Sequence, residues 1–564
     1  MYNVVDIIRH EIQSTVISGL MKSRICEIPE DFTEKDVPVE CTRDKTHGDF
    51  ATPIAFVLAG KAKRKPLDIA WALAGAMETT RDATRYIRRI EVAGSGFINF
   101  FLKREWLEDI LKVILKEGSE YGRSQIGRGT KILLEFVSAN PTGPMNIVNA
   151  RAAAVGTSLA NILKAVGYDV STEYYVNDAG GQINMLGASV EARYLQLKGE
   201  DVEFPESGYL GSYITDIACA AMENHYNELE MMETEERKEF FRNFALSRML
   251  ASQKASLSRF GVEFDEWFSE KKLVESNAVS EVIEILKNRG SVYWEDGALW
   301  LKTTEFGDEK DRVLIKSDGD YTYLAGDIAY HKNKMDRGFN LLINIWGPDH
   351  HGHVIPTRAG LEALGYPGGS LEVLLLQFLS LMSGGERVKM SKRQGEFVTM
   401  DDLVDEVGKD AARYFLLMRN IESHLEFDLN LAKEHSQANP VYYIQYAHAR
   451  ISSIFNQAGE NGINIRDMER LDLSGLVEDI ELDIIRKLAL YPDEVLMTAT
   501  DRAPSRLAGY ALDLAGLYHS FYNSHRVISE DSGLTVSRLA LSSAVRTVLA
   551  NALNLLGISA PHKM

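Results

Sequence analysis

The sequence predicts a multidomain α/β protein in which a doubly wound, Rossmann-type domain with a helical insertion lies between an N-terminal α+β domain and a C-terminal all-helical domain. Three observations support this fold class. With 564 residues, the chain is long enough for about three or four domains. Short apolar runs of strand length alternate with helical patterns through its middle. After about residue 400, the pattern is helical to the end.

The N-terminal domain is expected at residues 1–121. Helical spacing of apolar residues over 4–22 and 68–77 is followed by a strand-like run at 90–102. The next stretch, 120–131, is rich in glycine and charge, which is typical of a linker. A domain boundary close to the start of this linker follows.

The central domain, 122–400, begins with what we expect to be the first unit of a doubly wound sheet. An apolar run at 131–140 has strand length and leads into the turn residues Pro-Thr-Gly-Pro at 141–144. A long helical pattern covers 149–166, and a second strand is expected at 169–178. Ligands of such sheets bind at the carboxyl ends of the strands, so we expect a site after the first strand.

A mostly helical and acidic pattern at about 190–290 predicts an insertion within this domain. Residues 401–435 connect the central domain to the C-terminal helical domain, 436–564. Strand signals after the insertion are expected to continue the sheet at 298–303, 312–317, 321–326, 341–347 and 371–379. The breaks between the C-terminal helices are expected at three prolines, Pro440, Pro492 and Pro504.

Composition indicates a soluble protein of a reducing compartment. Hydrophobic residues make up 45% and charged residues 25% of the chain, which is ordinary globular usage. Cys26, Cys41 and Cys219 are too few and too scattered for a disulfide framework. The most apolar run, 371–382, is too short to span a bilayer, and no signal-peptide cleavage site follows the amphipathic first helix. We therefore expect a cytoplasmic protein without membrane contact.

The net charge of −19, taken alone, argues against a nucleic-acid ligand. The charge is unevenly distributed, however, because residues 1–105 contain 16 Lys or Arg and 15 Asp or Glu, a net of +1, so the rest carries −20. Two basic clusters in this part are candidate contacts for a nucleic-acid backbone, although a solvated helix face explains each cluster equally well. These clusters are Lys61, Lys63, Arg64 and Lys65, and the pair Arg88 and Arg89.

A lysine-rich tetrapeptide, Lys389-Met390-Ser391-Lys392, is the sharpest local motif, and glycines lie on both sides of it. Two lysines that bracket a serine in a loop can offer ammonium and hydroxyl donors to a polyphosphate. Such donors stabilise the charge that develops on a leaving pyrophosphate. As an isolated motif it is also typical of a solvated loop, so its interpretation depends on the rest of the chain.

A second motif lies about 240 residues earlier, in the segment EFVSANPTGPMNIVNARAAAVG at 135–156. The two motifs together resemble the KMSKS-type loop and the HIGH-type tetrapeptide of class I aminoacyl-tRNA synthetases, and the frame of the segment is similar to that of arginyl-tRNA synthetases. Here the tetrapeptide is Asn146-Ile147-Val148-Asn149, so asparagine replaces both histidines and valine replaces the glycine. An asparagine at a helix start can still donate to phosphate oxygens, whereas Val148 could crowd the adenine.

This resemblance implies two substrate sites. The residues at positions matching the family's ATP site are Pro144, Asn146, Asn149, Asp349, His350, Lys389 and Lys392. Those implied to act in catalysis are Lys389, Ser391, Lys392, Asn146 and Asn149. Both sets depend on the resemblance and not on spacing alone.

The arginine site is implied in the same way, and its chemistry is demanding because a guanidinium offers only donors and needs carboxylate or carbonyl acceptors. Glu135 and Asn140 match positions that hold the ammonium and carboxylate end of the substrate. Tyr323 and Asp327 match positions that meet the guanidinium. From its local sequence, Asp327 could equally be the N-cap of a helix.

The tract GPDHHGH, which contains Asp349, His350, His351 and His353, has two functional interpretations. In arginyl-tRNA synthetases the matching stretch lies near both substrate sites, whereas in DHH-type phosphoesterases a similar string binds a divalent metal. The metal site would need further acidic motifs, of which Asp178 is the main candidate. A structural role for at least one of the histidines is a third possibility.

The resemblance covers nearly the whole chain. Residues 47–73 and 94–102 resemble the family's N-terminal domain, which contacts the tRNA elbow. Residues 439–454, 507–527 and 555–564 resemble its helical anticodon-binding domain.

The implied function is ATP-dependent ligation of arginine to tRNA(Arg) through an arginyl adenylate. ATP would enter as its Mg²⁺ complex, with no permanent cofactor and no protein-bound metal, and the protein would act as a monomer. Three alternatives stay open. One is a tRNA-binding paralogue without catalysis, suggested by the Asn-Ile-Val-Asn tetrapeptide. The others are a synthetase for another amino acid, which would leave Asp327 unpaired, and a metal-dependent phosphoesterase.

Overall fold

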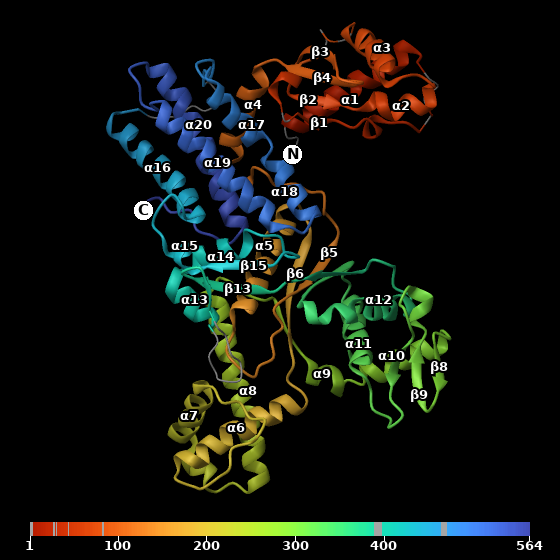
Figure 1. The fold of residues 1–564 in the computed structure, drawn as a ribbon, viewed down its shortest axis with the longest axis vertical. Helices are drawn as coiled ribbons and strands as arrows, with labels where there is room; N and C mark the ends of the chain where they lie inside the picture. The colour runs from red at the N-terminus through yellow and green to blue at the C-terminus, as the bar shows by residue number, and fades with distance from the viewer. Residues whose placement is uncertain are drawn as a thin grey trace.

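The computed structural model describes residues 4–25, 29, 31–42, 44–79, 81, 84–388, 398–463 and 471–564. Figure 1 shows them arranged around a central sheet, with the N-terminal unit beside a bundle of C-terminal helices and a group of inserted helices at the opposite end. The expected multidomain α/β fold, with a doubly wound domain between an α+β unit and a helical bundle, is confirmed.

The N-terminal unit packs helices against an antiparallel sheet with the strand order β1-β2-β4-β3. Val5, Ile8, Ile12 and Val16 recur at helical spacing in the first helix, and each is 0% exposed. The strands are β1 (Glu40–Cys41), β2 (Phe50–Thr52), β3 (Ile87–Ala93) and β4 (Phe97–Leu102). The helices are α1 (Val4–Ser23), α2 (Ile54–Ala62) and α3 (Pro66–Glu78), with short 3-10 turns η1 (Glu34–Asp36) and η2 (Lys45–His47).

The next helix, α4 (Glu105–Glu117), lies inside the predicted N-terminal domain but packs on the C-terminal bundle. Its apolar face contacts α17 (Asp479–Ala489) and α20 (Ser532–Leu555). The 3-10 turn η4 (Gly118–Glu120) follows it. As a packing unit, the N-terminal sheet and its helices therefore end with β4, one helix before the boundary expected from the linker.

The central sheet is parallel throughout and has the strand order β12-β11-β5-β6-β7. From β5, the chain builds outward to β7 on one side and then, through β11, to β12 on the other. The carboxyl ends of β5 and β11 therefore flank the crevice at which doubly wound sheets bind ligands. The strands are β5 (Lys131–Glu135), β6 (Asp169–Val176), β7 (Glu266–Ser269), β11 (Leu341–Trp346) and β12 (Leu371–Leu375). Helices α5 (Ile147–Ala165), α11 (Tyr323–Asp336) and α12 (Val354–Ala363) connect or flank them.

The insertion differs from its expected form, a helical stretch at about 190–290. Its helical part is a separately packed group, α6 (Gly181–Leu197), α7 (Ser212–Leu229) and α8 (Thr234–Arg259), with its own apolar core. The chain then returns to the central sheet as β7, which the sequence did not signal. This strand is short, and none of its residues is fully buried, so it lacks the apolar run by which the other strands were recognised.

A second inserted unit follows and explains two further differences. The strands expected at 298–303 and 312–317 are present at 298–301 and 312–315, but in an antiparallel sheet of order β10-β9-β8 and not in the central one. Residues 321–326 were expected as a strand, and this prediction is wrong, because they begin helix α11. The unit consists of α9 (Glu270–Glu275), α10 (Ala278–Asn288), β8 (Val292–Glu295), β9 (Ala298–Leu301), the turn η5 (Thr303–Phe306) and β10 (Arg312–Ile315).

The apolar run 371–379 is divided between two sheets. Its first part is β12 of the central sheet, and the chain then leaves for a small sheet of order β14-β13-β15. These strands are β13 (Leu379–Ser383), β14 (Glu386–Arg387) and β15 (Leu425–Asp428). The turn between β13 and β14 uses Gly384 and Gly385, whose φ angles of 61° and 82° favour glycine.

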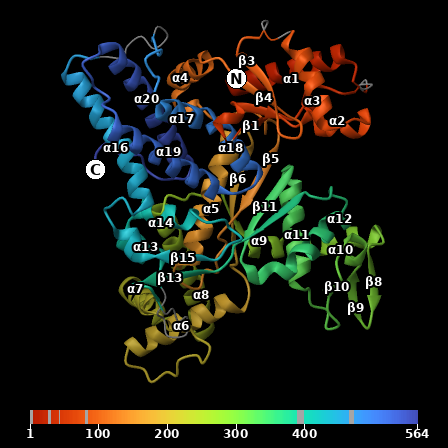
Figure 2. The same ribbon diagram turned by 45° about the horizontal axis from the view of Figure 1, so that its top comes forward.

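The C-terminal part is helical, as expected, and Figure 2 shows its long helices beside α5 of the central domain. Pro440 and Pro504 are the first residues of α16 and α19, and Pro492 is the second residue of α18, so the three expected breaks are confirmed. The remaining helices are α13 (Met400–Val407), α14 (Lys409–Leu417), α15 (Leu429–Lys433), α16 (Pro440–Glu460), α18 (Tyr491–Thr500) and α19 (Pro504–Ser524). No helix in the part of the chain that the structure describes is long and apolar enough to cross a membrane.

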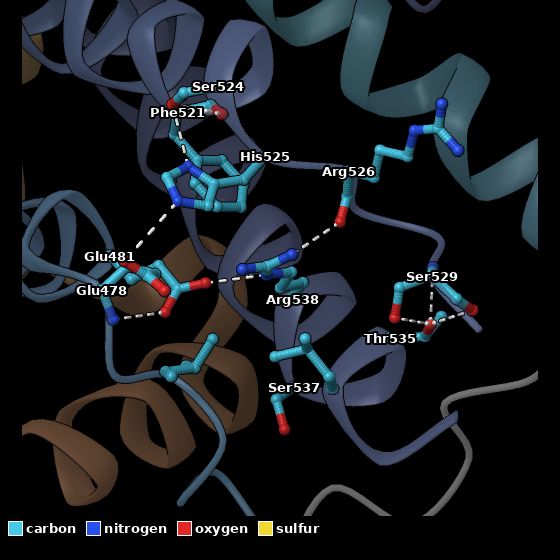
Figure 3. A network of polar contacts seen from close by, with 12 residues as sticks. Glu478, Glu481, Phe521, Ser524, His525, Arg526, Ser529, Thr535, Ser537 and Arg538 are labelled. Atoms are coloured by element: carbon cyan, nitrogen blue, oxygen red, sulfur yellow. Dashed lines mark hydrogen bonds and ion pairs between the residues drawn. The ribbon is translucent and has the colours of Figure 1, made fainter. Parts of the chain in front are cut away.

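A buried ion pair holds the far end of this bundle together (Figure 3). Arg538 Nε of α20 lies 2.8 Å from Glu481 Oε1 of α17, and the two side chains are 9% and 0% exposed. Arg538 Nη1 also donates to the backbone oxygen of Arg526 at 2.9 Å, in the connection between α19 and α20. Glu481 in turn accepts from the backbone N–H of Glu478 at 3.0 Å. The pair therefore links α17 and α20 to the connection between α19 and α20.

The central domain and the bundle share a polar junction along α5. Ser158 Oγ donates to Leu556 O at 3.1 Å, and Asn161 Nδ2 donates to Leu555 O at 3.3 Å. Arg413 of α14 is fully buried at the same place and donates to Leu556 O from Nε and Nη2 at 3.1 and 3.0 Å. Burial lowers the pKa of Arg413 to about 10, so the group still carries its charge near neutral pH. The end of α20 is thereby fixed to the middle of α5.

Candidate active site

The loop that follows β5, residues 136–146, has a strained backbone at the carboxyl edge of the central sheet. Val137 and Ser138 have φ angles of 69° and 38°, in the left-handed region, which costs an L-residue about 1–2 kcal/mol. Gln253 of the inserted helix α8 holds the loop, because its Nε2 donates to Asn140 O at 3.1 Å. Strain of this kind persists where the surroundings impose it, and it is typical of functional sites.

Two asparagines form the start of helix α5. Asn146 is the N-cap, and its Oδ1 accepts from the backbone N–H groups of Val148 and Asn149 at 2.9 and 3.0 Å. Asn149 Oδ1 accepts from the N–H of Asn146 at 3.0 Å, which completes a capping box. Both carbonyl oxygens are therefore used within the helix end, and neither side-chain amide group has a hydrogen-bond partner among the residues that the structure describes. A helix start with additional N–H donors favours a phosphate.

The lysine-rich tetrapeptide 389–392 lies outside the described residues. The roles of Lys389, Ser391 and Lys392 therefore stay predictions. The chain becomes described again at residue 398, beside the start of α5. Met400 N donates to Met145 O at 2.8 Å, and Thr399 forms a β-bridge with Asn146. The start of α13 is therefore held against the asparagine-capped start of α5.

A buried carboxylate ends β5. Glu135 is 6% exposed, and its Oε2 is bound by the Lys334 ammonium while its Oε1 accepts from Ser138 Oγ at 3.0 Å. Lys334 also donates to Asn344 Oδ1 of β11 at 3.3 Å. Burial alone would raise the pKa of Glu135, but the Lys334 charge and hydrogen bond hold it below its ordinary value. Glu135 is therefore a fixed negative charge beneath the site.

Two further carboxylates, Asp327 and Glu270, repel each other, and neither forms an ion pair within the part of the chain that the structure describes. Burial, followed by repulsion from Glu135 and Glu270, raises the pKa of Asp327 to about 7. Burial also raises the pKa of Glu270, the first residue of α9. The hydrogen bond from the Tyr175 hydroxyl lowers this pKa but does not cancel the effect of burial. Burial and the neighbouring Glu270, Asp327 and Glu135 raise the pKa of that hydroxyl in turn. The cluster is suited to a cationic ligand, because each carboxylate destabilises the charge of the others.

The remaining predicted residues lie at the rim of this cluster or farther out. Tyr323 is 87% exposed and begins helix α11, one turn before Asp327 on the same face. Asn140 is exposed, and Pro144 is half-buried, both in the loop that leads to α5. The alternative interpretation of Asp327 as an N-cap is wrong, because Thr322 holds that position and Asp327 lies within the helix.

The histidine tract after β11 forms a 3-10 turn, η6 (Pro348–His353), at the same edge of the sheet. The charged and imidazole side chains of this tract are all exposed: Asp349, His350, His351 and His353. Their exposure gives no support to a structural role for one of the histidines. His350 Nε2 lies 3.8 Å from Asp349 Oδ2, and its ring centroid is 6.1 Å from that of Trp346. Within the described ranges, no three His, Cys, Asp or Glu side chains are arranged to hold a metal ion.

Sequence reasoning missed three members of the cluster. Glu270 was assigned to the helical insertion, because β7, which precedes it, was not recognised. Tyr175 lies in the recognised strand EYYVND, but in that segment only Asp178 was considered, as a candidate metal ligand. That carboxylate instead accepts from Ser269 Oγ at 2.6 Å. Lys334 could have been found from spacing, since it follows Asp327 by two helical turns on one face.

Comparisons with known proteins agree across the chain. Three protein-family models match it: "Arginyl tRNA synthetase N terminal domain" over residues 4–102, "tRNA synthetases class I (R), catalytic domain" over 110–453 and "DALR anticodon binding domain" over 444–564. An arginine–tRNA ligase of Caldanaerobacter subterraneus subsp. tengcongensis is 48% identical over 565 residues, covering 100% of both chains. An arginine–tRNA ligase of Listeria monocytogenes serotype 4a (strain HCC23) is 47% identical over 564 residues, covering 100% of this chain and 99% of its own.

Solved structures give the same picture. The chain is similar to a putative arginyl-tRNA synthetase of Campylobacter jejuni, with a TM-score of 0.75 and 37% identity over 82% of this chain and 100% of that one. The arginyl-tRNA synthetase of Thermus thermophilus gives a TM-score of 0.74 over 99% of this chain and 100% of its own, at 22% identity, and this likeness supports the fold alone.

Proposed function

The chain belongs to the class I arginyl-tRNA synthetase family, and from this premise we infer that it uses ATP to ligate arginine to tRNA. Its relatives match over their whole length and carry that activity in their names. The silent paralogue, the synthetase for another amino acid and the metal-dependent phosphoesterase, which the sequence alone left open, are not favoured by these relatives.

The observation that carries the assignment of the arginine site is a pair of carboxylates, Asp327 and Glu270, that form no ion pair with any described residue. Arginine brings two cations, a guanidinium and an α-ammonium, and a planar guanidinium suits a carboxylate that can accept two parallel hydrogen bonds. Asp327, with Tyr323 at the rim, would meet the guanidinium. Glu135 and Asn140 would face the ammonium and carboxylate end of the substrate, since each Glu135 oxygen can accept more than one hydrogen bond.

On the ATP side, the donors of α5 would hold the phosphates. The outward amides of Asn146 and Asn149, together with the helix start, supply neutral donors where the family's histidines stand. Pro144 shapes the turn before the helix, and Asp349 and His350 border the same edge of the sheet. Mg²⁺ would arrive bound to the ATP phosphates as part of the substrate. The cationic part of the site would come from Lys389 and Lys392, with Ser391 between them.

The reaction has two displacements. A carboxylate oxygen of arginine attacks the α-phosphorus of ATP, and the bond to pyrophosphate breaks, which gives arginyl adenylate. A hydroxyl of the terminal tRNA ribose then attacks the carbonyl carbon, and AMP leaves as a proton is released. Such chemistry depends mainly on positioning and on stabilising charge on the departing phosphate. A site of fixed donors without a nucleophilic side chain is suited to it.

Two surfaces suit single-stranded or loop regions of tRNA. On the N-terminal unit, Phe56 and Phe97 have ring centroids 5.1 Å apart, and Trp71 is 61% exposed near the basic cluster at 61–65. On the bundle, Arg450 lies over Tyr446 and Tyr522, at 4.6 and 4.4 Å from the ring centroids. Exposed aromatics beside cations can stack on bases and contact phosphates, which offsets the negative net charge of the chain. We propose the first surface for the tRNA elbow and the second for the anticodon arm.

The test is charging of total tRNA with labelled arginine and Mg-ATP, with the other nineteen amino acids as controls. We expect charging with arginine alone by a monomeric, cytoplasmic enzyme. Tight tRNA binding without charging would instead identify a silent paralogue. A charging enzyme in which Asp327→Asn leaves the KM for arginine unchanged would remove this residue from the arginine site while leaving the function intact.

A further inference from the structure

Lys334 is a fully buried lysine directly beneath the proposed arginine site. Its side chain is 0% exposed, and its Nζ is bound to Glu135 Oε2, lies 3.3 Å from Asn344 Oδ1 and stands 4.1 Å from the centroid of the Tyr330 ring. These three partners come from β5, β11 and α11 itself. An ammonium has three donors, so partners inside the protein already satisfy Lys334, and it is not placed to bind a substrate.

The polar network leads from Lys334 through Asn344 of β11 back to α11, where it reaches the backbone of Asp327. Asn344 Nδ2 lies 2.8 Å from His331 Nε2, and His331 Nδ1 lies 2.7 Å from the backbone oxygen of Asp327. Burial, followed by the Lys334 charge, lowers the pKa of His331 to about 3, so this imidazole is neutral near pH 7. The network fixes the relative position of Glu135 and Asp327 without adding a second cation.

An account of the charges shows what Lys334 contributes. The titratable and charged groups that face this region are Glu135 of β5, Glu173 and Tyr175 of β6, Asp178 after β6, Glu270 of α9, and Asp327, Tyr330, His331 and Arg337 of α11. Arg337 Nη2 lies 2.6 Å from Glu173 Oε2, so these two charges compensate each other. Lys334 compensates Glu135 in the same way. Asp178 accepts hydrogen bonds from Ser269 Oγ and the backbone N–H of Lys271. Asp327 and Glu270 repel each other and form no ion pair within the described part of the chain.

We propose that Lys334 is a positioning residue for arginine: it balances the charge of Glu135 and orients that carboxylate, so that Asp327 stays ionised and can receive the guanidinium. This inference rests on the proposed arginine site. Without Lys334, three carboxylates would share one half-buried space with no cation, and each would be driven toward its neutral form. A protonated Asp327 would lose the ionic part of its interaction with the substrate.

A purely structural role makes a different prediction. Buried ion pairs often contribute little net stability, and replacing both partners with neutral residues of similar size is often tolerated. If Lys334 only stabilised the fold, its loss would lower the melting temperature but would not change how arginine use depends on pH. The pH profile of kcat/KM for arginine is therefore the deciding measurement, because it reports groups of the free enzyme.

The experiment compares four variants of the full-length enzyme in aminoacylation between pH 6 and 9. Lys334→Met should raise the KM for arginine by about tenfold or more at pH 7, and should move the acidic limb of kcat/KM upward by about one pH unit. The KM for ATP should change less than threefold. Glu135→Gln leaves the Lys334 cation unbalanced, so it should move the same limb downward. The double variant Lys334→Met/Glu135→Gln removes both charges and should return the limb to its wild-type position.

Lys332→Met is the matched control. Lys332 lies on the same helix and pairs with Asp336 at 2.6 Å, but it faces away from the site toward the surface. This variant should leave the pH profile and both KM values unchanged. If Lys334→Met does not fold, the downward shift in Glu135→Gln and the return in the double variant still decide the question.

Two results would overturn the inference. One is an unchanged acidic limb in both single variants, and the other is a shift of the same sign in both. If the arginine-site assignment itself is wrong, Asp327→Asn will leave the KM for arginine unchanged. An effect of Asp327→Asn on arginine without any shift in the Lys334 and Glu135 variants would reject only the role of Lys334.

Discussion

Asp327→Asn tests the arginine site most directly, because asparagine keeps the shape of the side chain but removes its charge and one of its two acceptor oxygens. Losing one partner of a desolvated charged pair costs about 2–5 kcal/mol. Asp327 is only half-buried, so solvent screening places the expected loss at the lower end, about 2–3 kcal/mol. At 1.4 kcal/mol per tenfold, this corresponds to about 30- to 150-fold in kcat/KM for arginine.

The assay is aminoacylation at pH 8, where an Asp327 with a pKa of about 7 is mostly ionised in the wild-type enzyme. Arginine and ATP are varied separately. We expect the KM for arginine to rise and the KM for ATP to change little, because the asparagine-capped end of α5 is untouched. Equal changes in both KM values, or an unchanged KM for arginine, would refute the assignment of this carboxylate.

The same substitution has an opposite effect on stability, which separates loss of a contact from misfolding. The pKa of Asp327 in the folded protein lies above its ordinary value, so folding favours the protonated form, and stability is lost as pH rises toward 7. Asparagine cannot ionise and removes this repulsion. Asp327→Asn without arginine should therefore melt at a higher temperature than wild type at pH 8, with a smaller difference at pH 5. A lower melting temperature at pH 8 would show that the side chain supports the fold instead.

Three further outcomes follow from the same structure. In the wild-type enzyme, kcat/KM for arginine should fall about tenfold per pH unit well below the Asp327 pKa of about 7, and a flat profile from pH 5 to 7 would contradict an ionised Asp327 as the receptor of the guanidinium. Lys392→Ala should lower kcat with little change in the KM for arginine, whereas an unchanged kcat would remove the lysine segment from the mechanism. Arg538→Met should lower the free energy of unfolding by about 3–5 kcal/mol, because it leaves Glu481 buried without its cation. The double variant Arg538→Met/Glu481→Leu should regain most of this free energy, as measured by denaturant titration. An equal loss in both variants would contradict the ion-pair argument.

The fold was predictable where apolar runs are long. β5 and β11 are buried on both faces, so their runs of aliphatic residues were visible without any partner, and β6 was visible from its valines and tyrosines. β7 was not predictable in this way, because it lies at the edge of the sheet and none of its residues is fully buried. The start of α11 was missed because the β-branched and aromatic residues of Tyr-Thr-Tyr locally favour a strand. Helical burial of Leu324, Ala325, Ile328 and Ala329 overrides that preference.

The site shows the same division. Glu135, Asp327 and the asparagines of α5 stand in recognisable segments, and the resemblance proposed roles for them. Glu270 and Lys334 are brought to the site by packing: Glu270 follows the unrecognised edge strand, and Lys334 reaches Glu135 of β5 from the same face of α11 as Asp327. Their chemistry depends on neighbours more than 100 residues away in sequence, such as Glu135, and a local pattern does not contain that information.

The junction of Ser158, Arg413 and Leu556 makes the central domain and the C-terminal bundle one cooperative unit of unfolding. A single continuous apolar core runs from the N-terminal helix to Ile558, whereas the helices 181–259 and the unit around β8–β10 have separate cores. Cutting the chain between the central domain and the bundle would leave the Arg413 guanidinium without the carbonyl that it binds, in an apolar surrounding. The central domain and the C-terminal bundle would therefore melt together, while the two inserted units could open without them.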